Sequence, residues 1–398
     1  MRAVRSRDVL LRVWLGFLLV GGCVGPDEQS GLAEQSSDWV VGDAADAGFD
    51  AAALEQLAAD IEGGEFANTH ALLIEHDGSL VFERYFSGSS DELWSGDVIA
   101  ARVMGPDSLH DVRSISKSVT SAVLGIALED AFESAVGRSI AEYLPELELG
   151  LEHQEITLHH LLTMTAGLEW NAKTGDMHDG IQFNRASDPV RYVMSKPIVH
   201  EPGSTFNYSD GTTQVLVTVI SRLTGSMLRE YAAERLFTPL GITEFEWLGP
   251  PAWSSGDAAA ASGLRLKARD LAKIGSLYLH GGRWRGRQVV PEAWVSRSSM
   301  PHVAEAWIAA ELIPQLSAAG KAAIKDVWFD YDTVMGYGYQ WWVGELPSGE
   351  RVVFGIGVGD QLLFVLPSER LVVTIFAGQY NASEPHSDRI LKRVLAAR

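Results

Sequence analysis

The chain has 398 residues, of which 46% are hydrophobic and 21% are charged, a composition that excludes extensive disorder. A single cysteine excludes an internal disulfide framework and any metal site built from several cysteines. The formal net charge of −20 argues against a nucleic-acid partner, because binding to phosphates requires a basic surface.

The N-terminus has the layout of an export signal. Four arginines within the first twelve residues lead into an apolar run over residues 13–20, which is too short to span a membrane. The run ends at Val20-Gly21-Gly22-Cys23, which resembles a bacterial lipobox, and an ordinary signal peptide with an incidental cysteine is the alternative. We expect residues 1–22 to be a lipoprotein signal peptide, Cys23 to be lipidated and residues 23–44 to be a flexible linker. The protein would then be secreted across the bacterial inner membrane and held there by its lipid, facing the periplasm or the cell surface.

The first predicted elements after the linker are a helix and a strand hairpin. Residues 51–61 have the apolar spacing of a helix, with Asp50 as its N-cap. Residues 71–75 and 80–85 have strand-like sequences, and the turn sequence between them predicts a hairpin.

The middle of the chain is predicted to be mainly helical, and strands return towards its end. Residues 114–129 form a helix that is hydrophobic on most faces, which indicates a buried, central position. Helical signals continue over about 130–255. Four strands and a helix follow, over residues 338–343, 351–354, 361–366, 371–376 and 388–397.

This order of elements predicts an α+β fold. Short loops between the late strands imply antiparallel pairing. The simplest assembly is one antiparallel sheet formed from about 45–110 and 260–398, flanked by the terminal helices, with a helical lobe over about 130–255. We therefore expect residues 45–398 to form one domain.

Ser114 and Lys117 form an S-x-x-K pattern at the start of the apolar helix. Residues i and i+3 share a helix face, so the lysine amine can reach the serine hydroxyl. A serine hydroxyl needs a neighbouring base to act as a nucleophile, and lysine can be that base if burial leaves it neutral. The alternative is a helix start with a lysine whose amine reaches out to solvent.

Two further elements have the character of a reaction site. Tyr208 lies in a loop that opens a helix, where a phenolate beside a lysine ammonium can act as a general base, or where a tyrosine simply packs. The alternating glycines Gly355, Gly357 and Gly359 precede a strand instead of a helix, so they do not form a dinucleotide-binding loop. Glycines in a strand allow close approach of a ligand, and an exposed backbone N–H there can stabilise an oxyanion.

Together these elements resemble the serine β-lactamase and penicillin-binding-protein superfamily. The nearest branch looks like the class C β-lactamase-related serine hydrolases, which include 6-aminohexanoate-dimer hydrolases and family VIII esterases. Four more stretches carry the resemblance, which covers about residues 45–398: Asp111 to Ser114, Ile156 to Leu168, Ser262 to Ala272, and Gly336 to Trp342.

The resemblance implies a role for each matching residue. Ser114 would be the acyl-accepting nucleophile and Lys117 its partner base, and Tyr208 would relay protons to the leaving group. The backbone N–H groups of Ser114 and Val358 would form the oxyanion hole. Which of Lys117 and Tyr208 is neutral at rest stays open at this stage, because the two would titrate as a coupled pair.

Substrate contacts are expected from Asp210, Gly357 and Gly359, and this part of the sequence departs from the family pattern. Asp210 stands where many relatives have asparagine, and Asp360 replaces a usual glycine, which narrows the site or alters its charge. The late strand lacks the K-T-G sequence whose cation usually binds a substrate carboxylate. A literal Lys173-Thr174-Gly175 occurs earlier in a polar loop and is interpreted as a coincidence.

The resulting hypothesis is a serine hydrolase that cleaves small ester or amide bonds through an acyl-enzyme, with no metal and no cofactor. The missing K-T-G favours esters or uncharged amides over classical β-lactams. The alternatives are a D-alanyl peptidase-like enzyme acting on cell-wall peptides and a catalytically silent binding protein of the same fold. His159 and His160 are interpreted as structural residues and not as metal ligands. The sequence makes no prediction of the oligomeric state.

Overall fold

The structure, a computed structural model, describes residues 39–171, 179–254, 256–304, 306, 335–345, 349–380 and 386–398. The predicted signal peptide, Cys23 and the Lys173-Thr174-Gly175 sequence lie outside these residues. Within the described ranges, no helix combines the length and the apolar character needed to cross a membrane.

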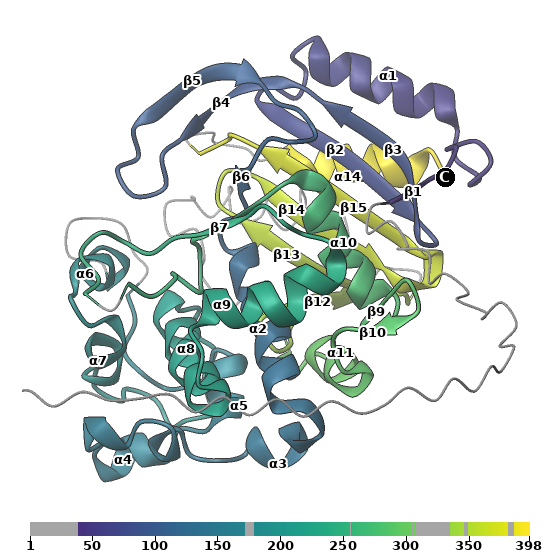
Figure 1. Cartoon of the computed structure of the whole chain (residues 1–398). Helices are drawn as coiled ribbons and strands as arrows, with labels where there is room; N and C mark the ends of the chain where they lie inside the picture. Colours follow the sequence, from purple (N-terminus) through teal and green to yellow (C-terminus); the bar gives the residue numbers. More distant parts are fainter. Residues whose placement is uncertain are drawn as a thin grey trace, which may run out of the picture. The chain divides into compact units, whose positions relative to one another are not determined.

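An eight-stranded sheet formed from both ends of the chain is the centre of the fold (Figure 1). Its strand order is β1-β3-β2-β15-β14-β13-β12-β11, and every neighbouring pair is antiparallel except β1 and β3. The strands are β1 (Val40–Val41), β2 (Thr69–His76), β3 (Ser79–Tyr85), β11 (Gly336–Tyr337), β12 (Trp342–Glu345), β13 (Arg351–Gly357), β14 (Gln361–Leu366) and β15 (Leu371–Ala377). The predicted α+β class with one antiparallel sheet is therefore confirmed, apart from the parallel edge pair.

The first and last described helices, α1 (Ala51–Glu62) and α14 (Ser387–Ala396), cover one face of the sheet. Helix α1 begins at Asp50, whose side chain accepts a hydrogen bond from the Ala53 N–H over 3.1 Å, as the sequence predicts. Their apolar faces join the sheet in one buried cluster that includes Leu54, Leu57, Ile390, Leu391, Ile74, Phe364 and Val373. The terminal helices flank the sheet as predicted.

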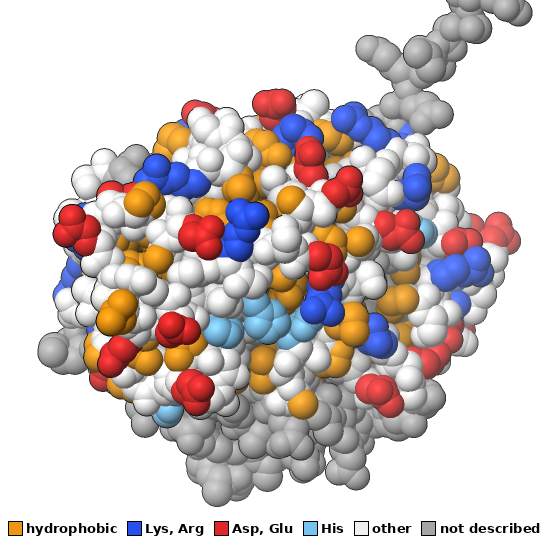
Figure 2. Space-filling view, turned by 90° about the horizontal axis from the view of Figure 1, so that it is seen from below, with side chains coloured by type: hydrophobic (Ala, Val, Ile, Leu, Met, Phe, Trp, Pro, Cys, Tyr) orange, Lys and Arg blue, Asp and Glu red, His pale blue; other side chains and the backbone are white. Residues whose placement is uncertain are grey.

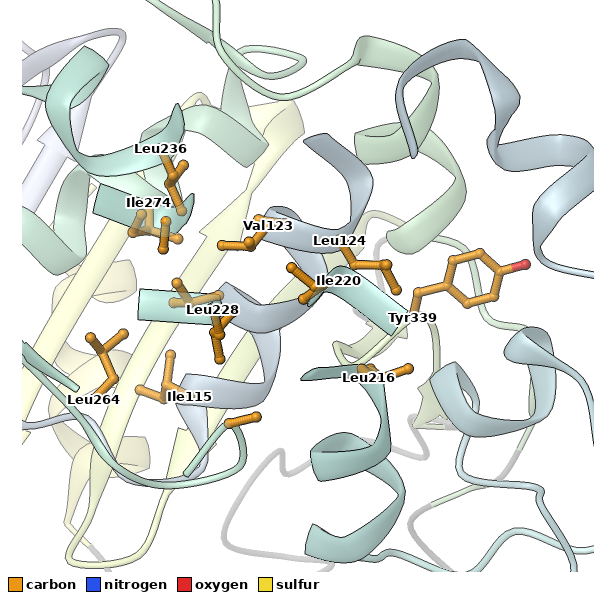
Figure 3. Packing of buried hydrophobic residues seen from close by; sticks show 14 of the residues in the cluster. Ile115, Val123, Leu124, Leu216, Ile220, Leu228, Leu236, Leu264, Ile274 and Tyr339 are labelled. Atoms are coloured by element: carbon orange, nitrogen blue, oxygen red, sulfur yellow. The ribbon is translucent and has the colours of Figure 1, made fainter. Parts of the chain in front are cut away.

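Helix α2 (Ile115–Leu128) lies in the core on the other face of the sheet. All of its residues except Ala127 are buried, which explains why its sequence is apolar on most faces. Figure 3 shows Ile115 and Leu124 of α2 among buried side chains from other helices, including Ile220 of α8 (Asp210–Thr224). The same cluster contains residues of α10 (Ala268–Leu279) and α11 (Glu292–Ser298).

The middle of the chain forms the predicted helical lobe, drawn in teal in Figure 1. Besides α8 it contains α3 (Phe132–Ala135), α4 (Leu151–Gln154), α5 (Leu158–Leu162), α6 (Asp179–Arg185), α7 (Pro189–Met194) and α9 (Leu228–Ala232). Three small sheets complete the described fold. They are formed by β4 (Ser87–Asp91) with β5 (Val98–Val103), by β9 (Arg283–Trp284) with β10 (Arg287–Gln288), and by β6 (His110–Asp111), β8 (Leu264–Leu266) and β7 (Glu246–Trp247).

The folded part of the chain begins before residue 44, which was predicted to be the last residue of the flexible linker over residues 23–44. Val40 and Val41 pair with Ser79 and Leu80 of β3. The Trp39 side chain is buried, with its ring 4.9 Å from that of Trp284 in an edge-to-face contact. Burial of a large aromatic ring fixes this segment, so the last residues of the predicted linker belong to the fold.

Of the strand predicted over residues 338–343, only Trp342 and Val343 lie in a strand, because residues 338–341 form the turn between β11 and β12. In this turn Gln340 adopts a left-handed φ of 64°. The buried Gln340 amide donates to the carbonyls of Leu161 and Leu162 over 3.1 and 3.0 Å and accepts from the Thr213 hydroxyl over 2.7 Å. The Gln340 carbonyl accepts from the Ser118 hydroxyl over 2.8 Å. Gln340 thereby connects α2, α5 and α8, and these bonds outweigh the strand tendency of the local sequence.

Candidate active site

The S-x-x-K serine lies at the first turn of α2. Ser114 is the N-cap residue, and its hydroxyl makes no capping bond to the helix, which leaves the oxygen available for other partners. The Lys117 ammonium donates to the Ser114 Oγ over 3.0 Å, as the i, i+3 spacing predicts. Ser114 itself is half-buried, so part of the residue stays accessible from outside the fold.

All three Lys117 N–H donors have oxygen partners in the structure. Besides Ser114, the Lys117 Nζ donates to the carbonyl of Ala261 over 3.0 Å and pairs with the Asp210 carboxylate over 2.7 Å. The lysine side chain is 1% exposed, whereas that of Asp210 is 40% exposed. The amine is therefore fixed between the serine and a carboxylate that solvent can reach.

This environment determines the charge of Lys117. Burial by itself would lower the lysine pKa, but the negative charge of Asp210 and the phenol of Tyr208 outweigh burial, and the pKa is raised. A raised pKa favours the ammonium form of Lys117. Asp210, expected from the sequence to contact substrate, pairs with Lys117 in the structure, and its side chain stays 40% exposed.

Tyr208 lies next to this pair, in the loop that leads into α8. Its ring is centred 4.8 Å from the Lys117 Nζ and stacks on Trp342 at 5.9 Å with an interplanar angle of 16°. The Tyr337 ring packs edge-on against it at 6.3 Å. The sequence-predicted Ser114, Lys117 and Tyr208 are therefore brought together, although they come from two separate segments of the chain.

Val358 lies away from the strand on which the sequence analysis placed it. Strand β13 ends at Gly357, and Val358 falls in the turn before β14, with its side chain 65% exposed. Gly355 and Gly357 lie against the start of α2, since a Cβ on Gly357 would be 2.5 Å from the Val112 carbonyl. The backbone that approaches Ser114 is thus the segment from Gly355 to Gly357.

Gly359 and Asp360 stabilise the fold around this turn. Gly359 has a φ of +89°, and a Cβ there would be 2.3 Å from the Tyr380 ring. The buried Asp360 carboxylate accepts hydrogen bonds from the backbone N–H groups of His386 and Ser387, over 2.6 and 2.8 Å, at the start of α14. The expectation that Asp360 narrows or charges the site is therefore wrong, because its carboxylate is used to cap a helix.

Arg113 is a site residue to which the sequence analysis gave no role. It has a left-handed φ of 49°, and its guanidinium donates to the carbonyl of Asp91, the last residue of β4, over 3.0 Å. The same group pairs with Asp111 over 3.3 Å and lies 4.6 Å from the centre of the Tyr380 ring. In the sequence, only its position directly before Ser114, in the stretch from Asp111 to Ser114, pointed to a place near the site.

The two histidines interpreted as structural both have protein partners. His159 Nδ1 lies 3.0 Å from the Tyr339 hydroxyl, and His160 Nδ1 accepts from the Thr157 N–H over 3.2 Å at the start of α5. The His159 ring also contacts that of His302, and Figure 2 shows a band of histidine side chains on the face drawn there. Among the described residues, no three metal-ligating side chains are arranged to hold an ion.

Comparison with known proteins places this geometry in a family. The beta-lactamase family model matches residues 57–397. A 6-aminohexanoate-dimer hydrolase from Paenarthrobacter ureafaciens is 27% identical over 280 residues, which cover 67% of this chain and 66% of that relative. Esterase EstB from Burkholderia gladioli is 32% identical over 158 residues, which cover 36% of this chain and 40% of that relative.

The fold comparison agrees with the sequence comparison. The crystal structure of a family VIII carboxylesterase matches with a TM-score of 0.64 at 15% identity, covering 87% of this chain and 96% of that one. At this identity the match shows the shared fold alone, whereas the family model spans nearly the whole described chain. The chain therefore belongs to the beta-lactamase family, in the superfamily of serine β-lactamases and penicillin-binding proteins.

Proposed function

We propose that this protein is a serine hydrolase that cleaves small ester or amide bonds through an acyl-enzyme on Ser114. The observation that carries the proposal is the 3.0 Å contact between the Ser114 Oγ and the buried Lys117 ammonium, with the Tyr208 ring beside that ammonium. A lysine whose three donors converge on a serine, a carboxylate and a carbonyl is held in one position and cannot swing out to solvent.

The charge of Lys117 assigns the proton transfers to Tyr208. An ammonium cannot accept the serine proton, so the tyrosine oxygen in its anionic form takes it while Ser114 attacks the substrate carbonyl carbon. Lys117 supplies the positive charge that stabilises that oxygen. Tyr208 then returns the proton to the leaving alkoxide or amine, and water hydrolyses the acyl-enzyme by the reverse sequence of transfers.

The developing oxyanion requires two backbone donors. We assign them to the N–H of Ser114 and, in place of Val358, to the N–H of Ile356. Two observations support the second assignment. Strand β12 pairs with β13 only as far as Phe354, so the last three residues of β13 have an open edge on that side. Ile356 is half-buried between the two glycines that lie against α2, and it packs in the same cluster as Tyr208.

Uncharged substrates fit the charges around Ser114. Arg113 is paired with Asp111, and Lys117 is paired with Asp210, so neither cation is left to bind a substrate carboxylate. This favours a small ester or uncharged amide over the anionic substrates of a β-lactamase or a D-alanyl peptidase.

Labelling with a fluorophosphonate tests the proposal directly. We expect one adduct per chain by intact mass, its absence in Ser114→Ala, and hydrolysis of short p-nitrophenyl esters by the wild-type protein only. Folded wild-type protein that forms no adduct and cleaves no ester would instead support the catalytically silent binding protein.

Changing Asp210 to asparagine tests the assigned charge state. Asp210 raises the pKa of Lys117, so its removal lowers that pKa, and the ammonium loses its proton at a lower pH. We expect the alkaline limb of the kcat/KM profile against pH to move to lower pH in Asp210→Asn. Asp188→Asn, which changes the exposed N-cap of α7, serves as the control and should leave the profile in place. An unmoved profile in Asp210→Asn would contradict the ammonium assignment.

A further inference from the structure

Met164 lies in the turn after α5, beside the loop that carries Tyr208. The side chain is 1% exposed, and the backbone adopts a left-handed φ of 60°, which is uncommon for a residue with a long side chain. The side chain belongs to the same apolar cluster as Phe206 and Trp342, against which Tyr208 packs. The family comparison and the proposed reaction give this residue no role.

Met164 contacts the backbone on both sides of Tyr208. Its carbonyl accepts from the Asn207 N–H over 2.8 Å, and its Sδ accepts from the Ser209 N–H over 3.2 Å. The Thr212 hydroxyl lies 3.3 Å from the same sulfur. The N–H groups of the residues before and after Tyr208 are thus both held by one residue of a different segment.

The sulfur contact satisfies a donor that has little access to water. Ser209 is 2% exposed and is the N-cap of α8, where its side chain accepts from the Thr212 N–H over 3.3 Å. A buried N–H without a partner is costly, and a thioether is a weak but real acceptor. Without the sulfur, the Ser209 N–H has to find another acceptor, and the peptide that follows Tyr208 can rotate.

We propose that Met164 is a positioning residue for Tyr208: its carbonyl and its thioether fix the tyrosine backbone so that the phenol stays beside Lys117 and Ser114. This inference rests on the proposed function, because it assigns Met164 to the proton transfers of that reaction. The left-handed backbone of Met164 is consistent with it, since strained conformations persist where the surrounding bonds require them.

Met164→Leu is the first test, since leucine keeps an apolar side chain of similar size and removes the acceptor. Met194→Leu is the matched control, because Met194 is 5% exposed in the helical lobe on α7. With a p-nitrophenyl ester we expect Met164→Leu to lower kcat about 10- to 100-fold, the effect of misplacing a reacting group by roughly 1 Å. We expect its KM to stay within about twofold and the pH profile of kcat to shift, because Tyr208 no longer sits at a fixed distance from Lys117. Met194→Leu should change none of these.

Incorporation of norleucine in place of methionine is the second test, and it serves if Met164→Leu folds poorly. Norleucine keeps the length of the side chain and lacks only the sulfur. Replacing all 8 methionines of the wild-type protein by norleucine should lower kcat as Met164→Leu does. The same replacement in the Met164→Leu background should lower kcat little further. Full kcat and an unchanged pH profile in norleucine protein that still labels on Ser114 would overturn the positioning role alone. Absence of labelling and hydrolysis in the ordinary wild-type protein would overturn the proposed function and this role with it.

Discussion

Replacing Lys117 with alanine is expected to lower kcat/KM for a short p-nitrophenyl ester by about 10³-fold or more. The ammonium is the hydrogen-bond partner of the Ser114 Oγ, the ion-pair partner of Asp210 and the cation next to the Tyr208 ring. Its removal therefore takes away the charge that stabilises the proton acceptor and leaves a carboxylate facing the serine. Losing a positioned acid–base group typically costs 10²- to 10⁴-fold, which sets the scale of the expected loss.

The chain contains a matched control for this variant. Lys273 and Asp270 form a buried i, i+3 ion pair of 2.9 Å on α10, with side chains 5% and 9% exposed. Lys273→Ala removes a buried lysine from a buried pair as Lys117→Ala does, so a general loss of stability would appear in both variants. We expect kcat/KM to fall steeply only in Lys117→Ala, measured well below the unfolding temperature of each variant. Equal losses in both would mean that Lys117 acts through folding.

Acidification is expected to destabilise the fold strongly through a buried histidine pair. His70 Nδ1 lies 2.7 Å from His110 Nε2, and His110 Nδ1 donates to the Asp111 carbonyl over 3.0 Å, so His70 donates to His110 when both are neutral. Burial lowers the pKa of His70 to about 4 and that of His110 to about 3. The unfolded chain, with histidine pKa values near 6.5, binds protons that the folded chain does not.

The sign of the effect follows from this difference. Stability is full above about pH 6.5 and falls as the pH drops towards 4, because the unfolded state gains protons first. At pH 4 each histidine lowers the free energy of unfolding by about 3 kcal/mol, since one pKa unit corresponds to about 1.4 kcal/mol. This is a large share of the 5–15 kcal/mol by which a domain is typically stable. The urea midpoint should fall steeply across this range in the wild-type protein and less steeply in His70→Gln. His200→Gln, which changes an exposed histidine, should follow the wild type. A midpoint that does not vary between pH 7 and 4 would contradict the neutral pair.

The parts of the site that follow from local spacing could be predicted from the sequence. The contact between Ser114 and Lys117 depends only on helix geometry, and the apolar surroundings of α2 follow from its composition. The sheet was predictable as well, because its late strands are apolar runs that are joined by short turns. These features can be predicted without knowing which distant segments of the chain pack together.

The errors all concern contacts between distant segments. The use of Asp360 depends on the start of α14, which is not a neighbour in sequence. The charge of Lys117, which the sequence left open, depends on the distant Asp210. The strand predicted over residues 338–343 is broken because the Gln340 side chain binds two other helices. Val358 was misplaced because glycine alternation indicates close approach to the backbone without showing where the strand ends.

The pairing of β2 with β15 has a consequence for how the protein reaches its native state. The register joins Glu75 to Val372, so the two central strands lie roughly 300 residues apart in the sequence. Bringing β2 and β15 together closes a long loop, and the chain loses this entropy before stabilising contacts form. Folding is therefore slow compared with that of a helical bundle. A growing chain on the ribosome presents β2 and β3 long before β15 is synthesised. Until then the edge of β2 that pairs with β15 is open, and an unpaired strand edge can pair with strands of other chains.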